Sequence, residues 1–147
     1  MEETRALLRH LLATIAHRTR KCLALELAGF VPGGGVRTPA EIVRHMAGLC
    51  GGAGALLLGR PRAELPPLPW AGEIARLEAV LCELDAAVAA APVWSGDPLR
   101  VVQGPLADML THAGQLAMLS RLAGAPLPAE NFSQAPIQAG ELRLTAG

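Results

Sequence analysis

The chain has 147 residues, of which 51% are hydrophobic and 18% charged, and its 13 basic residues balance 13 acidic ones. A chain of this length forms one domain, burying roughly two thirds of its unfolded surface, so we expect a single domain over residues 1–147. The absence of excess charge argues against nucleic acid and membrane surfaces as partners. The high apolar content favours a homodimer that covers part of this surface.

The N-terminal stretch MEETRALLRH is charged where a secretory signal needs an apolar segment. The longest uncharged run, residues 46–59, is too short and too rich in glycine to span a bilayer as a helix. We therefore expect a cytoplasmic protein. The odd number and wide spacing of Cys22, Cys50 and Cys82 predict buried free thiols that bind no metal.

The first two helices are predicted on either side of a glycine-rich loop. Apolar residues at three- and four-residue steps predict a helix from about Glu2 to Leu27, and Gly29 ends it. Thr38 then has the features of an N-cap, because Pro39 follows at the first helical position and Glu41 completes a capping box. This is the clearest helix start in the sequence.

The second helix contains glycines at positions 48, 51, 52 and 54, each costing about 1 kcal/mol relative to alanine. They either permit close helix packing or mark a break. A proline-rich connector over residues 59–69 precedes a third helix from Trp70 to Ala91, which Pro92 ends.

A fourth helix is predicted from Gly104 to Gly124, and the remaining tail has three prolines and no sustained helical period. Four helices in one domain predict an all-α four-helix bundle with an irregular C-terminal tail.

Two histidines fall on apolar helix faces in this prediction. His112 lies inside the apolar arc of the fourth helix, with Asp108 one turn before it at the margin. His45 lies at the edge of the apolar stripe of the second helix, with Glu41 one turn before it. Two imidazoles and one or two carboxylates on two helices are the donors of a mononuclear divalent metal site with an open position.

A second interpretation of the same spacing is a core histidine whose hydrogen bonds a nearby carboxylate or carbonyl satisfies, which is the commoner case. Glu41 is already explained by the capping box. Neither acid lies three residues before its histidine, so the Glu-x-x-His pattern of di-iron bundles is absent.

The segments TPAEIVRHMAGL and GPLADMLTHAGQLAMLSRLAGAPL, followed by ENF, resemble the DinB/YfiT-like superfamily of metal-binding four-helix bundles. The resemblance covers about Glu2 to Phe132. It implies one divalent metal held by three histidines, one from the second helix and two from the fourth. His45 matches the first ligand and His112 the last, whereas Asp108 occupies the remaining position, where the superfamily usually has histidine.

The resemblance also implies an up-down-down-up bundle, which the connector permits because residues 59–69 span roughly 35 Å when extended. In that topology the second and fourth helices are antiparallel. His45 and His112 then match in height if the fourth helix begins nearer Asp97, or if the site is tilted.

The function implied is a metal-dependent hydrolase or thiol transferase. One divalent ion (zinc, nickel, manganese or iron) would activate a water or a low-molecular-weight thiol. Gln115 would donate a hydrogen bond beside the ligands or to the substrate, and Trp70 or Trp94 would wall the pocket. The alternative is a metal-free bundle for dimerisation or partner binding, which Asp108 and the glycine-weakened second helix favour.

Overall fold

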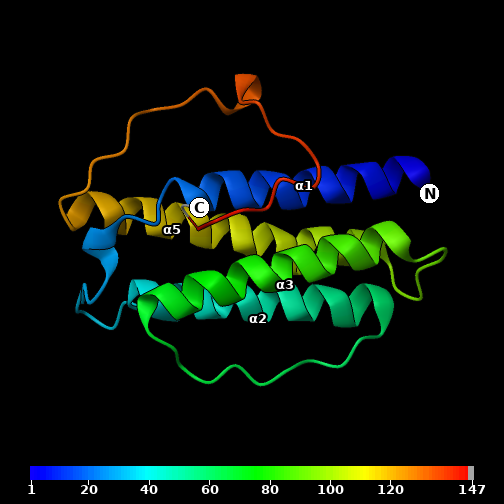
Figure 1. Ribbon diagram of the computed structural model, residues 1–147, viewed down its shortest axis with the longest axis horizontal. Helices are drawn as coiled ribbons and strands as arrows, with labels where there is room; N and C mark the ends of the chain where they lie inside the picture. Colours follow the sequence, from blue (N-terminus) through cyan, green and yellow to red (C-terminus); the bar gives the residue numbers. More distant parts are fainter. Residues whose placement is uncertain (146–147) are drawn as a thin grey trace.

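The computed structural model describes residues 1–145 as a bundle of four long helices (Figure 1). These are α1 (Glu2–Arg20), α2 (Pro39–Leu58), α3 (Trp70–Ala90) and α5 (Ala107–Leu122). The short helix α4 (Pro98–Val101) and the π-helical turn η2 (Val102–Leu106) lead directly into α5, and two 3-10 turns, η1 (Leu25–Leu27) and η3 (Phe132–Gln134), lie in the connections. Since residues 1–145 contain no strand, the prediction of an all-α four-helix bundle is confirmed.

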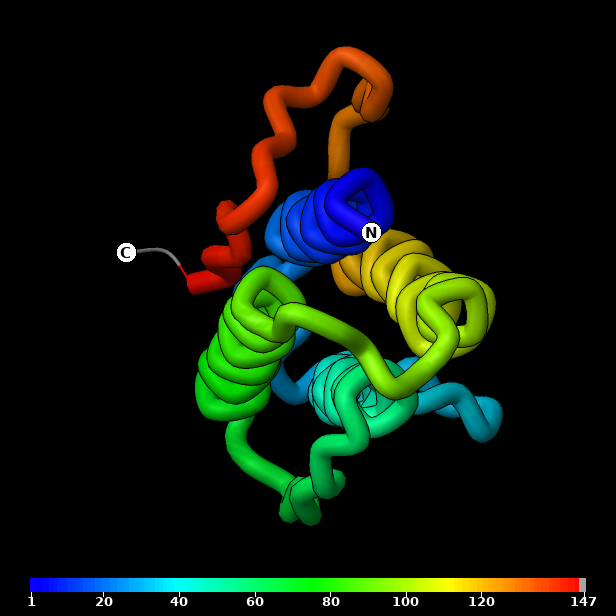
Figure 2. Tube along the Cα trace, turned by 90° about the vertical axis from the view of Figure 1, so that its right-hand side faces the viewer, coloured from blue at the N-terminus to red at the C-terminus, as the bar shows by residue number. Residues whose placement is uncertain are grey.

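The helices run up-down-down-up: α1 and α5 point one way, and α2 and α3 point the other (Figure 1). Seen end on, α1 and α2 occupy opposite corners of the bundle, so that each packs against both α3 and α5 (Figure 2). The connector over residues 59–69 returns along the whole of α2, as this topology requires. Consequently α2 and α5 are antiparallel neighbours.

The first helix is shorter than predicted, because α1 ends at Arg20 and the chain then turns through η1. The apolar period continues to Leu27, and this side chain is buried at 1% exposure although it lies in η1, outside the helix. The 3-10 turn η1 also contacts α5. Tertiary burial of Leu27 therefore replaces the last helical turns.

The predicted start of the fourth helix at Gly104 is wrong: the helical segment begins at Pro98, near the alternative start at Asp97. Asp97 is the N-cap and accepts a hydrogen bond from the Leu99 N–H at 2.9 Å. Pro105 has no N–H and would clash inside a regular α-helix, and the wider turn η2 accommodates it. Gly104-Pro105 therefore marks a bulge within the helix.

The glycines of α2 do not break it, since the helix is continuous over Pro39–Leu58. Side chains of the connector lie against them instead. The nearest atoms to a Cβ built at Gly48, Gly52 and Gly54 include those of Leu65, Arg62 and Arg60, each at 3.8 Å. The glycines therefore form the surface on which the connector packs.

The C-terminal tail is irregular, as predicted, and passes back along α1 (Figure 1). Its end is attached to α3: Glu78 accepts hydrogen bonds from the N–H groups of Leu144 and Thr145, and Leu144 is buried. These hydrogen bonds lower the pKa of the Glu78 carboxyl. Within residues 1–145, no helix combines the length and apolar character needed to cross a membrane.

Gly96 provides a stability test of the α3–α4 connection. Its N–H donates to the carbonyl of Leu57 at 3.1 Å, and a Cβ at this position would lie 1.7 Å from the carbonyl oxygen of Leu56. The Gly96→Ala variant is therefore expected to lose about 2–3 kcal/mol of unfolding free energy in urea denaturation, because backbone atoms must separate. Gly51→Ala is the control, since its Cβ meets nothing within 4 Å. Equal midpoints for the two variants would contradict this packing.

Candidate metal centre

Three side chains predicted as metal ligands converge between α2 and α5. His45 comes from α2, Asp108 and His112 come from α5, and one ligand atom of each lies within 4.8 Å of the others. His112 is buried at 5% exposure, whereas His45 and Asp108 are half-buried. The two imidazole rings are tilted by 55° with centroids 4.6 Å apart. The early start of the α5 segment at Pro98 places His112 well inside it and opposite His45.

The hydrogen bonds of His112 define its tautomer. Its Nδ1–H donates to the backbone carbonyl of Asp108 at 2.7 Å, because a carbonyl oxygen only accepts. Its Nε2 accepts a hydrogen bond from Nη1 of Arg37 at 3.2 Å, because a guanidinium only donates. His112 is therefore neutral, with its Nε2 lone pair directed at a cation. Metal-binding histidines commonly show the same arrangement, with the other ring N–H bonded to a carbonyl.

The Asp108 carboxylate lies between the two imidazoles. Its Oδ1 is 3.2 Å from His112 Nδ1, and its Oδ2 is 3.6 Å from His45 Nε2. Burial lowers the pKa of His45, and the charge of Arg37 and the neighbouring His112 lower it further, against the opposing effect of Asp108. The neutral form that binds metals is thus favoured at His45.

Arg37 is the residue of this site that the sequence analysis missed. It lies in the glycine-rich loop immediately before the N-cap Thr38, is exposed, and reaches across to His112 on α5. Nothing in the local pattern PGGGVR identifies such a contact, since it depends on how α2 and α5 pack. The Arg37 guanidinium occupies the direction in which His112 would bind a metal.

The donor set suits a divalent transition metal, because two imidazole nitrogens and a carboxylate bind zinc, nickel, manganese or iron. Ligands at about 2.0–2.1 Å from a metal lie roughly 3–3.5 Å from each other. The 3.6 Å between His45 and Asp108 is close to this separation. Binding through His112 Nε2 additionally requires Arg37 to move, which its exposed loop position allows. The three side chains could thus hold a metal ion.

An open groove of about 610 Å³ adjoins the cluster and supplies access from solvent. Asp108 and Thr111 of α5 form one wall, and Gly52 and Leu56 of α2 form the other. Arg62 of the connector lies at its edge and donates to the carbonyl of Gly48 at 3.1 Å. A small substrate reaching Asp108 would enter through this groove.

The remaining predicted residues lie outside the cluster. Glu41 is exposed and completes the capping box with Thr38, which lowers the pKa of its carboxyl. Gln115 is exposed on α5, and Trp70, the first residue of α3, packs against the core. Neither Trp70 nor Trp94 lines the groove beside Asp108.

The cysteines are free, and none belongs to the metal-ligating group found in residues 1–145. Cys22 and Cys50 are buried as predicted, and burial raises the pKa of the Cys50 thiol to about 12. The prediction is wrong for Cys82, which is exposed because it points outward from α3 between the core residues Leu81 and Leu84.

Fold and site together define a four-helix bundle with a His–Asp–His group between two antiparallel helices. Comparisons with protein-family models, curated proteins and solved structures found no match to this chain.

Proposed function

We propose that this chain is a mononuclear metal-binding bundle of the DinB/YfiT-like kind, in which His45, Asp108 and His112 hold one divalent metal. The observation that supports this proposal most directly is the hydrogen bonding of His112. Its Nδ1–H donates to the carbonyl of Asp108, and its Nε2 faces the Arg37 guanidinium. The Nε2 lone pair that now accepts from Arg37 is the one that would bind the metal. The convergence of His45 and Asp108 supplies the other two ligands.

The proposed reaction class is hydrolysis or thiol transfer with a small-molecule substrate. A divalent metal bound here would lower the pKa of a water or low-molecular-weight thiol at its open position. The protein contributes a fixed imidazole at His112 and a half-buried carboxylate at Asp108. The adjoining groove admits the substrate on the Asp108 side.

Metal analysis tests the metal site directly. Protein purified without a histidine tag should contain about one divalent metal per chain by elemental mass spectrometry. After stripping with a chelator, it should regain thermal stability on addition of zinc, nickel or manganese, since a ligand at 100 times its Kd stabilises the fold by about 2.7 kcal/mol. Absence of both metal and thermal stabilisation would exclude the metal-dependent function.

The Arg37 contact also favours a second function, a metal-free bundle that acts as a homodimer or partner-binding module. The guanidinium already satisfies His112 Nε2. Exposed apolar side chains on the outer face of α5, Met118 at 63% and Leu122 at 66%, offer a surface for a second copy. A metal-free protein that sediments as a dimer would support this function over the first.

Replacing Arg37 should strengthen metal binding if the site holds a metal. The Arg37→Gln variant removes a competing donor from His112 Nε2 and a positive charge that repels a dication, so we expect about tenfold tighter zinc binding by calorimetry. Arg100→Gln is the matched control, because it removes the same charge from an exposed position on α4. Equal zinc affinities for the two variants would contradict the competition.

A further inference from the structure

A second cavity, of about 450 Å³, lies between α1, α5 and the C-terminal tail. Its walls include Arg18 near the end of α1, Gly114 and Arg121 of α5, and Phe132 of the tail. None of His45, Asp108 and His112 lines it. This cavity is therefore separate from the metal centre and its groove.

Three basic side chains and one carboxylate line the cavity: Arg18, Lys21 and Arg121 against Glu130. Glu130 is already engaged, because it pairs with Lys21 and lies 2.8 Å from Nε2 of His17. Among residues 1–145, no carboxylate lies within ion-pair distance of Arg18 or Arg121. The cavity thus carries two guanidinium groups without a matching anion.

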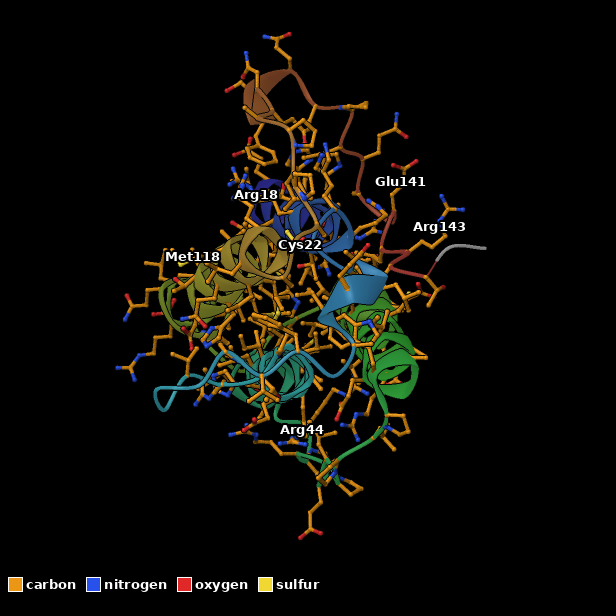
Figure 3. All side chains as sticks on the ribbon, turned by 90° about the vertical axis from the view of Figure 1, so that its left-hand side faces the viewer. Arg18, Cys22, Arg44, Met118, Glu141 and Arg143 are labelled. Carbon is orange, nitrogen blue, oxygen red and sulfur yellow. The ribbon has the colours of Figure 1, made fainter. Side chains whose placement is uncertain are left out.

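The Arg18 side chain is fixed by a stacking contact, although its Nε has no hydrogen-bond acceptor in the described residues. Its guanidinium lies over the ring of Phe132 at 3.9 Å, which fixes the side chain between α1 and the tail. Figure 3 labels Arg18 beside α1, on the side of the bundle where the tail passes. The Nε of Arg18 is buried and has no acceptor in the described part of the chain. The Arg18 guanidinium thus lines the cavity with unused hydrogen-bonding capacity, which an anionic acceptor would take up.

The rest of the lining is apolar. Leu110, Ala113 and Ala117 come from one face of α5, and Leu127 comes from the tail. At Gly114 a Cβ would meet nothing within 4 Å, so the absence of a side chain leaves the space between them open. Apolar walls beside guanidinium groups suit a ligand with an apolar body and an anionic head.

From these observations we propose that the cavity binds a small amphipathic carboxylate. The carboxylate would accept hydrogen bonds from Arg18 and Arg121, and the apolar body would lie along Ala113, Gly114 and Ala117. An inorganic anion would leave the apolar walls uncovered, and an uncharged apolar molecule would leave the guanidinium groups of Arg18 and Arg121 without an anion. The basic part and the apolar part of the cavity therefore favour a ligand that has both an anionic head and an apolar body.

Calorimetric titration of the full chain with octanoate, below its micelle concentration, tests the proposal. We expect saturable binding of one octanoate per chain, and at least about tenfold weaker binding of octan-1-ol, which has the same apolar body without the charge. Absence of octanoate binding, or equal affinity for the alcohol, would overturn the proposal.

Two variants locate the binding. Gly114→Leu fills the cavity and should abolish octanoate binding, whereas Gly51→Leu makes the same change at another open helical position, on α2, and should leave it unchanged. Arg121→Gln, at an exposed position, should weaken octanoate binding about tenfold. Unchanged octanoate binding in Gly114→Leu, with the fold confirmed by circular dichroism, would refute the assignment to this cavity.

Discussion

Replacement of Glu73 by alanine is expected to lower the free energy of unfolding by about 2–4 kcal/mol, because it removes a fully buried carboxylate and leaves the half-buried Arg76 and Arg44 without this ionic partner. The Glu73 side chain is fully buried near the start of α3. It pairs with Arg76, accepts the N–H of Leu68 at 2.9 Å, and lies 3.7 Å from Arg44 of α2. One carboxylate thus joins α2, α3 and the end of the connector.

Urea denaturation followed by circular dichroism measures this loss. Glu83→Ala is the control, since Glu83 is an exposed carboxylate on the same helix and its removal should change the unfolding free energy by no more than about 0.5 kcal/mol. Glu73→Gln separates charge from hydrogen bonding: it keeps an acceptor for Leu68 but loses the charge facing two arginines. Similar denaturation midpoints for Glu73→Ala and Glu83→Ala would show that the buried network contributes little.

Features of the fold encoded locally could be predicted from the sequence. The capping box of Thr38 and Glu41 forms as predicted, because both partners lie within one turn and need no other helix. Asp97 and Pro98 form the same kind of N-cap and first-turn proline, but the fourth helix was predicted to begin at Gly104-Pro105, because proline is normally excluded from a helix interior. The structure retains Pro105 through a π-helical turn, and packing of η2 against α2 accompanies this irregular backbone.

The residues of the candidate site likewise fall into two groups, those predicted from the local sequence and those that depend on packing between helices. Helical period and spacing placed Asp108 and His112 one turn apart, and the inward position of His45 followed from its own helix. Arg37 was missed because its contact with His112 joins segments distant in sequence, and Glu73 was missed because its complete burial depends on how α3 packs, although Arg76 and Leu68 lie near it in the sequence. Arg37 precedes a helix and Glu73 lies in a first helical turn, where exposed charges are ordinary. Only the packing of α2 against α5 and α3 shows what these two side chains contact.

If the site holds a metal as proposed, replacement of His112 by alanine is expected to weaken metal binding by about 100-fold or more, because it removes one of the three proposed ligands and the one that is buried. The metal-free variant should keep its fold, with a loss of about 1–2 kcal/mol for the hydrogen bonds to Asp108 and Arg37. Zinc should therefore raise the melting temperature of the unaltered chain and leave that of His112→Ala unchanged.

His10→Ala is the matched control, since His10 is exposed on α1 and away from the cluster. It should retain both the zinc affinity and the thermal shift. The two interpretations of His112 predict opposite results. If His112 is a ligand, the His112→Ala variant loses its metal with little loss of stability. If His112 is a core residue, the variant loses stability with no change in metal content. A large fall in unfolding free energy for His112→Ala, together with unchanged metal content, would show that His112 is a core residue whose Nε2 stays hydrogen-bonded to Arg37.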